Sequence, residues 1–347
     1  MKLSLGNSSG PVIALAAAAL FGAGTPVAKW LLADTSPWLL SGMLYFGAGL
    51  GMTLTRLLQP GSDANMRRQD LPWLAGAVVA GGLIGPVLLM YGLSATPASS
   101  ASLLLNAEAV FTALLAWFAF RENFDLRIVL GFLAIVAGAV ILSWPGPHMA
   151  RSVSSTIAIL AACLAWAIDN NLTRMISLAD ERLIVMVKGL VAGTINIMIA
   201  TGMGASLPSW SHVALALLIG WLSYGLSLAL FVVALRGLGT ARTGAYFSVA
   251  PFFGAVLAVV VFAEPLTLAL IAAAVLMGIG VWLHVTEHHE HEHTHVALEH
   301  SHEHDHDEHH QHEHAGKAHG RHTHWHRHEP LTHTHRHVPD AHHRHDH

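Results

Sequence analysis

Histidines at alternate positions dominate the end of this chain, and imidazole is a good ligand for transition-metal ions. Residues 287–347 hold 25 of the 28 histidines. Alternate residues of an extended strand share one side and lie about 6.6–7 Å apart, so a flexible segment can bring two imidazoles to one ion. We expect many overlapping sites for Ni, Co, Zn or Cu. The metal ligands proposed from this pattern are His291, His293, His295, His300, His302, His304, His306, His312, His314, His322, His324, His326, His328, His333, His335 and His337.

The same segment is too polar to bury a core of its own. It carries 5 basic and 12 acidic side chains and few apolar ones, which predicts a tail that is disordered without metal. Free histidine has a pKa near 6.5, so protons compete with metal close to cytosolic pH. Two other roles stay open: a store that buffers metal, and a pH sensor that responds to histidine charging.

Glu108 lies in the middle of an apolar stretch, residues 98–119. Ten residues of helix place it roughly 15 Å deep, where a carboxylate usually faces a cavity or a partner. Such a group can exchange a proton for a cation. Ser102, six residues earlier, lies on the same helix face. The alternative is a structural contact with a neighbouring helix.

Asp169, Asn170 and Asn171 are three adjacent polar residues in another apolar stretch. Together they cover nearly the whole circumference of a helix, so part of this segment must face a cavity or another helix. Carboxylate and amide oxygens suit either a hydrated cation or an organic solute. Alternatively, Asp169 bonds to Thr173 or Arg174 as a local structural contact.

Two lysines lie four to five residues from the ends of apolar stretches. Long side chains at this depth commonly extend to the membrane interface, and we expect this of Lys188. Lys29 follows Pro26. It is a candidate counter-charge for Glu108 in a central cavity, with extension to the interface as the alternative.

The elements that must position these residues are membrane-spanning helices. The chain is 53% hydrophobic and only 12% charged, whereas soluble domains carry about 25% charged residues. Spans of about 20 residues are predicted at 11–33, 37–58, 71–93, 98–119, 126–144, 155–177, 183–203, 212–235, 240–263 and 266–286. With the N-terminus inside, ten Lys and Arg side chains face the cytoplasm and only Arg151 faces out. This predicts a multi-pass inner-membrane protein with both termini cytoplasmic.

An internal repeat divides the body into two halves. Shifting Leu104–Gly138 by 142 positions places it on Tyr246–Gly280, with Glu122 on Glu264. Five spans per half make the halves inverted, the usual plan of secondary transporters. Chance similarity between Ala- and Leu-rich segments is the alternative. The predicted divisions are a first repeat (1–144), a periplasmic linker (145–154), a second repeat (155–286) and the tail (287–347).

Two segments carry a resemblance to a known family. Ala113–Glu122, and Ala255–Glu264 with Pro251 before it, resemble EamA-type permeases of the drug/metabolite transporter superfamily, across roughly residues 11–286. The resemblance implies an all-α membrane protein of ten helices that transports a small solute. Members with histidine-rich tails are implicated in nickel and cobalt resistance, and this chain is similar to them. Ala109 stands where the first half would match Pro251.

The sequence thus favours a secondary exporter of Ni- or Co-class divalent cations, driven by proton exchange and supplied by the tail. The main alternative is an exporter of a small organic metabolite or amino acid with a metal-responsive or metal-buffering tail. A third is a membrane-tethered metal store. Motifs of enzymes, such as a P-loop or a His-Glu-x-x-His helix, are missing from the sequence. We expect no required cofactor, no nucleic-acid partner, contact with the lipid bilayer, and a possible homodimer.

Overall fold

The computed structural model describes most of the helical body and parts of the tail. The described residues are 10–58, 66–120, 126–144, 149–176, 180–238, 243, 246–286, 290–295, 298–304, 322–328 and 331–336. In the tail only the backbone of these residues is described.

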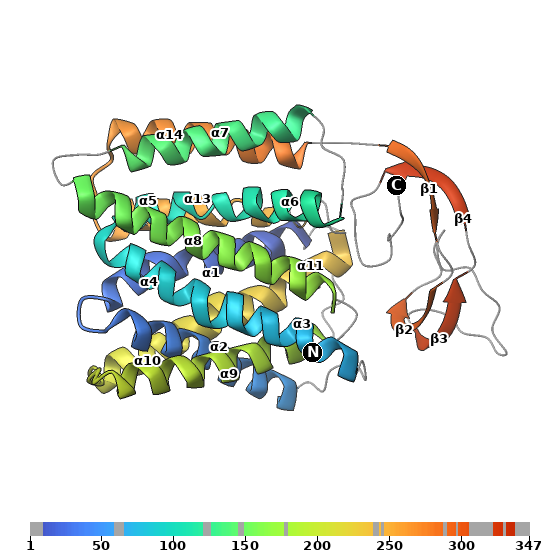
Figure 1. Cartoon of the computed structure of the whole chain (residues 1–347), viewed down its shortest axis with the longest axis horizontal. Coiled ribbons are helices and arrows are strands. Elements are labelled where there is room, and N and C mark those ends of the chain that lie inside the picture. The colour runs from blue at the N-terminus through green and yellow to red at the C-terminus, as the bar shows by residue number, and fades with distance from the viewer. Residues whose placement is uncertain are drawn as a thin grey trace.

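The described body is all-helical (Figure 1). Its first half contains α1 (Gly10–Leu31), α2 (Pro37–Leu58), the short 3₁₀-helix η1 (Arg68–Asp70), α3 (Leu71–Ala77), the π-helix η2 (Val78–Ile84), α4 (Gly85–Ala95), α5 (Ala98–Leu104), α6 (Ala107–Phe120) and α7 (Leu126–Ser143). The second half contains α8 (Met149–Arg174), α9 (Glu181–Gly202), α10 (Trp210–Ile219), the π-helix η3 (Gly220–Leu226), α11 (Ser227–Leu238), α13 (Ala250–Val261) and α14 (Leu268–Val285). Helix α8 begins inside the predicted linker.

Six helices in the described part are long and apolar enough to cross a membrane. They are Gly10–Leu31, Arg68–Ala95, Ala98–Leu115, Val153–Thr173, Arg182–Gly202 and Trp210–Phe231. Three shorter apolar helices are Val129–Ser143, Ala250–Val261 and Leu268–Leu283. The count of ten spans goes beyond these helices and stays a prediction.

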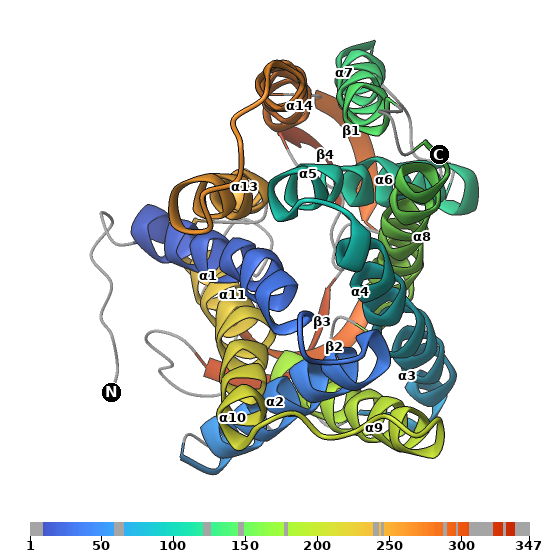
Figure 2. The same ribbon diagram turned by 90° about the vertical axis from the view of Figure 1, so that its left-hand side faces the viewer.

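Helices of the two halves pack against one another. Helix α2 contacts α9, α7 lies beside α14, α4 and α6 contact α8, and α1 contacts α11 and α13 (Figure 2). Glycines allow the closest of these approaches. A Cβ on Gly189 of α9 would lie 2.6 Å from the amide nitrogen of Gly49 and 2.7 Å from the carbonyl oxygen of Tyr45 in α2. These two backbones therefore touch directly.

The fourth predicted span is broken in its middle, whereas the sequence predicted one helix over 98–119. A turn at residues 105–106 separates α5 from α6. The side-chain amide of Asn106 donates to the carbonyl oxygen of Leu103 at 2.9 Å, a local bond that competes with helix continuation. The break places Glu108 in the first turn of α6, where free backbone amides and the helix dipole favour a carboxylate.

Irregular backbone occurs at matching places in the two halves. The π-helices η2 and η3 each have seven residues and begin at Val78 and Gly220, separated by the same 142 positions as the repeat in the sequence. A turn at residues 248–249 precedes α13, close to the counterpart of the 105–106 turn. Because π-helices are rare and concentrate at functional sites, this agreement extends the repeat from sequence to backbone.

Parts of the tail form antiparallel strand pairs. Strand β1 (Glu290–His295) pairs with β4 (Leu331–Arg336), and β2 (Leu298–His304) pairs with β3 (His322–His328). Disorder is thus not confirmed for these segments, because alternation of residue types also suits the two-residue period of a strand. His306, His312, His314 and His337 lie outside the described residues, as do the side chains of the other tail histidines.

Candidate functional site

A cavity lies between helices of both halves, bordered by α1, α2, α6, α8, α9, η3 and α11. Its volume is about 230 Å³. The lining is mainly aromatic and aliphatic and includes Phe21, Tyr45, Trp166, Tyr224 and Phe247 with the ionisable Glu108, Asp169 and Lys188 and the polar Asn170, Ser223 and Ser227. The space suits a small solute better than a drug-sized ligand, whose pockets measure about 300–1,000 Å³.

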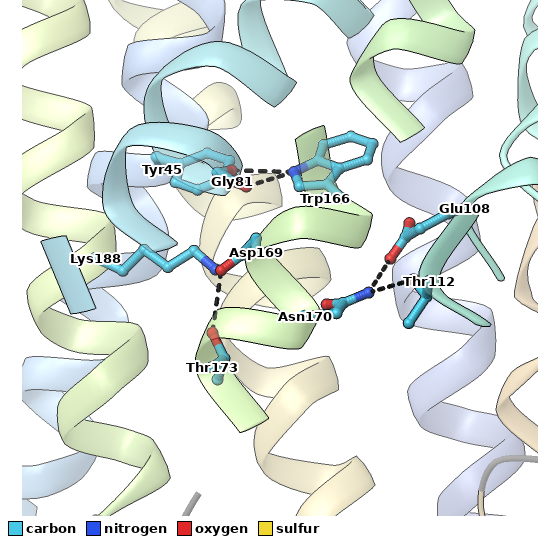
Figure 3. Close-up of polar contacts among 9 residues, drawn as sticks. All are labelled: Tyr45, Gly81, Glu108, Thr112, Trp166, Asp169, Asn170, Thr173 and Lys188. Atoms are coloured by element: carbon cyan, nitrogen blue, oxygen red, sulfur yellow. Dashed lines mark hydrogen bonds and ion pairs between the residues drawn. The ribbon is translucent and has the colours of Figure 1, made fainter. Parts of the chain in front are cut away.

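Glu108 faces Asn170 across the contact between α6 and α8 (Figure 3). The Asn170 amide donates to Oε1 of Glu108 at 2.9 Å and to Oγ1 of Thr112 at 3.3 Å. Thr112 lies four residues after Glu108, so it is on the same face of α6. The structure thus brings together two of the residues that the sequence proposed for the pathway, and one amide group holds the carboxylate in place.

Asp169 forms an ion pair with Lys188 of α9. Asp169 is buried, with 3% of its surface exposed, and it also accepts a hydrogen bond from the Thr173 hydroxyl at 3.1 Å. The contact with Thr173 was the structural alternative considered for Asp169. We had expected Lys188 to extend to the membrane interface, but it pairs with Asp169 instead. A carboxylate on the adjacent helix lies within its reach, and pairing offsets the cost of two charges in an apolar surrounding.

Asp169 and Asn170 point in opposite directions from α8 (Figure 3). Asp169 points toward α9 and Asn170 toward α6, so consecutive residues of one helix supply polar groups to two walls of the cavity. Asn171 is not among the lining residues. Its side chain donates to the carbonyl oxygens of Thr112 at 3.2 Å and Ala167 at 2.9 Å, which makes it a contact between α6 and α8.

An aromatic wall next to the ion pair was not identified from the sequence. The hydroxyl of Tyr45 and the indole nitrogen of Trp166 both donate to the carbonyl oxygen of Gly81, at 2.6 and 3.0 Å. Gly81 belongs to the π-helix η2, whose irregular hydrogen bonding leaves a carbonyl for side chains. The rings of Tyr45 and Tyr224 lie 5.6 Å apart, centroid to centroid. The two glycines at 81–82 were the only available signal in the sequence.

Two other proposed pathway residues lie away from this cavity. Lys29 donates to the carbonyl oxygens of Leu93 and Ser94 and is not part of the lining. It therefore does not act as the counter-charge of Glu108 in this structure. Ser102 is 1% exposed and lies against Gly254 of α13; the turn at residues 105–106 interrupts the helix between Ser102 and Glu108, so the two need not share a helix face.

Metal-ligating side chains do not cluster in the described part of the chain. No group of three or more His, Cys, Asp or Glu side chains is arranged there to hold an ion. His212 lies beside Asp34, with Nδ1 3.9 Å from the carboxylate, at the start of α10. The proposed tail ligands lie outside the described side chains.

Comparison with known proteins identifies relatives of this fold. An "uncharacterized transporter" of Methanothermobacter thermautotrophicus is 29% identical over 293 residues, covering 79% of this chain and 85% of that protein. A "probable amino-acid metabolite efflux pump" of Salmonella typhimurium is 29% identical over 204 residues, 54% of this chain and 68% of that protein. A known crystal structure shares the fold with a TM-score of 0.61 and 19% identity, over 80% of this chain and 96% of that one.

The model of the EamA-like transporter family matches this chain twice, at residues 8–144 and 153–286. The two matches cover nearly the whole helical body and divide it between α7 and α8, where the sequence repeat divides it. Together with the apolar helices, they place the chain in a lipid bilayer as a multi-pass protein. The chain belongs to the EamA-like transporter family, whose members are transporters and not enzymes.

Proposed function

We propose that this protein is a secondary transporter that exports a small organic solute with an apolar or aromatic part and a charged amino or carboxyl group. The observation that carries this proposal is the cavity itself. It combines aromatic rings on one side with an ion pair, Asp169–Lys188, and a carboxylate, Glu108. A ring of the solute can stack on Tyr45 or Trp166. The charged group of the solute can pair with Asp169 or Lys188 in place of the ion pair between them.

The cavity suits an organic solute better than a hydrated metal ion. Asp169 already has a cationic partner in Lys188, and that ammonium repels a second cation at short range. Transition metals favour imidazole and thiolate ligands, and the lining offers neither. The name of the Salmonella relative, a probable amino-acid metabolite efflux pump, agrees with an organic cargo.

The transport cycle follows from the repeat. Ten helices in two inverted halves would place the cavity near the membrane midplane, with both termini and the tail in the cytoplasm. Glu108 would take up a proton when the solute leaves, since it is an ionisable group that lines the cavity and would then lose the solute's charge as a neighbour. Rocking of the halves would expose the site alternately to each side of an inner membrane.

Export of Ni- or Co-class cations is the second candidate function. The histidine-rich tail favours it, because 25 imidazoles in one segment would raise the metal concentration at the inner mouth. In this version Glu108 would bind the ion directly. The tail also fits the first candidate, as a metal-responsive regulator of an organic exporter.

Reconstituted liposomes would separate the two candidates. The full chain is tested with radiolabelled phenylalanine, tryptophan, and ⁶³Ni²⁺ or ⁵⁷Co²⁺ alone. We expect counterflow of an organic probe above that of empty liposomes, and about a tenfold loss in Asp169→Asn. Asp34→Asn removes an exposed carboxylate from the α1–α2 turn and serves as the matched control. Passage of metal ions without passage of either organic probe would replace the first candidate by the second.

A further inference from the structure

The turn between α4 and α5 is held by two charged side chains from other helices. Glu264, in the link from α13 to α14, accepts hydrogen bonds from the backbone amides of Ala98 and Ser99 at 2.6 and 2.9 Å. It also accepts a hydrogen bond from the Ser99 hydroxyl at 2.5 Å. These amides are the first of α5 and have no partner inside their own helix.

Lys29 binds the other side of the same turn. Its ammonium group donates to the carbonyl oxygens of Leu93 and Ser94, at 2.6 and 2.9 Å, in the last turn of α4. An anion at a helix N-terminus and a cation at a helix C-terminus both complement the helix dipole. The α4–α5 turn is thus fixed to α1 by Lys29 and to the end of α13 by Glu264.

The residue before Glu264 has an unfavourable backbone conformation. Ala263 has φ of +53°, and it is the non-glycine residue with positive φ in the described part of the chain. This left-handed position after a helix is usually glycine, because a Cβ is strained there. This strained residue is directly next to Glu264, which binds the start of α5. Strained backbone is often found in segments that change conformation.

These contacts lie at the end of the molecule opposite the tail. Helix α14 runs from Leu268 toward the tail, so Glu264, which precedes it, lies at its far end (Figure 1). Helix α5 leads directly to the turn at residues 105–106 and to Glu108. Movement of α5 would therefore open the space between α5 and α13 and shift the carboxylate of the cavity.

We propose that Lys29, Glu264 and the α4–α5 turn form a latch that closes the transport path on the face away from the tail. The latch must open once in each transport cycle. The strain at Ala263 destabilises the latched state and so lowers the free energy needed to open it. This inference rests on the transport function proposed above, but it does not depend on which solute is carried.

Thiol labelling tests the latch without any substrate. In a Cys163→Ser background, Ser102→Cys places a single thiol on the buried face of α5 against α13. A membrane-impermeant maleimide is added to the face away from the tail. We expect labelling to be about tenfold faster in Glu264→Gln and Glu264→Ala, on the scale of a lost helix cap.

Ala263→Gly provides an opposite test. Glycine removes the strain of the latched state, so labelling should slow by about fivefold, the scale of the penalty for a left-handed residue. A contact that only stabilises the fold would raise the melting temperature in Ala263→Gly and leave labelling unchanged. Asp34→Asn, which changes a charge on the same face outside the latch, should label at the parent rate.

Unchanged labelling in both Glu264 variants, with the parent's melting temperature, would overturn the latch. So would faster labelling in Asp34→Asn, because the loosening would then be general. Failure of every solute in the liposome assay, with labelling as expected, would remove the proposed cargo and leave the latch in place. If the Glu264 variants do not fold, Ala263→Gly decides the question alone.

Discussion

Replacing Lys188 by Met removes the only described cation that faces Asp169. The side chain of Asp169 is 5% exposed and that of Lys188 is 17% exposed, so bulk solvent compensates little of the charge that is left behind. The substitution keeps most of the apolar stem of Lys188 and therefore most of its packing. What changes is the balance of charge around a buried carboxylate.

The size of the effect follows from this burial. Removing one partner of a buried ion pair costs about 3–5 kcal/mol, because the other charge stays buried without compensation. The Thr173 hydroxyl still donates to Asp169 at 3.1 Å, and Lys188 is partly exposed. We therefore expect a loss near the lower limit, about 3 kcal/mol.

A double-mutant cycle separates the ion pair from packing. Lys188→Met, Asp169→Asn and the double variant are compared with the parent by thermal unfolding in detergent. At about 2.1 cal/mol/K per residue, the unfolding entropy of 347 residues is about 0.7 kcal/mol/K, so Lys188→Met should lower the melting temperature by roughly 4 °C. The double variant should recover most of this loss, because no charge is left unpaired.

The reasoning fails if Lys188→Met costs less than about 1 kcal/mol, the value typical of exposed pairs. It also fails if the double variant is no more stable than Lys188→Met, since the loss would then come from packing. The first result would mean that Lys188 reaches the interface, as the sequence alone had indicated.

Three further predictions use the same preparations. Glu108→Gln keeps the hydrogen bond from Asn170 but cannot release a proton, so solute exchange should continue while proton-driven accumulation falls by about tenfold; equal loss of both would argue against proton coupling by Glu108. Gly189→Ala brings a methyl group within 2.6 Å of the α2 backbone. The forced separation of the two helices should cost about 1–3 kcal/mol of stability, measured as a lower melting temperature. Gly202→Ala is the control, because Gly202 has open space around it. Truncation after Thr286 should abolish binding of Ni²⁺ in equilibrium dialysis and leave phenylalanine counterflow intact, whereas loss of counterflow would make the tail part of the pathway.

The prediction that Glu108 and Asp169 face a cavity or a partner needed only the sequence. A charge in the middle of an apolar helix is costly in lipid, so it must face a cavity or a partner whatever the rest of the fold is. The same argument gave Asn170. The pairing of these groups could not be predicted in the same way, because it depends on how α8 is rotated against α6 and α9.

Lys29 and Glu264 show this dependence over long distances in the chain. Glu264 is separated by 166 positions from Ala98, whose amide it binds, and Lys29 by 64 positions from Leu93. Periodicity places a residue at a depth along its own helix. It does not say which helix end lies opposite, so neither the cavity nor the interface, the two positions considered for Lys29, matched the helix terminus that it binds.

Hydropathy, loop charges and the repeat were thus enough to indicate a multi-pass membrane transporter, because each of these is a pattern along the chain that does not depend on which helices touch. Metal binding by the histidine-rich tail stays a prediction. Tertiary structure alone decided the lining of the cavity, where Tyr45 and Trp166 meet at a carbonyl freed by a π-helix, and where Lys188 finds Asp169. Those contacts arise from the packing of helices against one another, and the proposal of an organic solute rests on this packing.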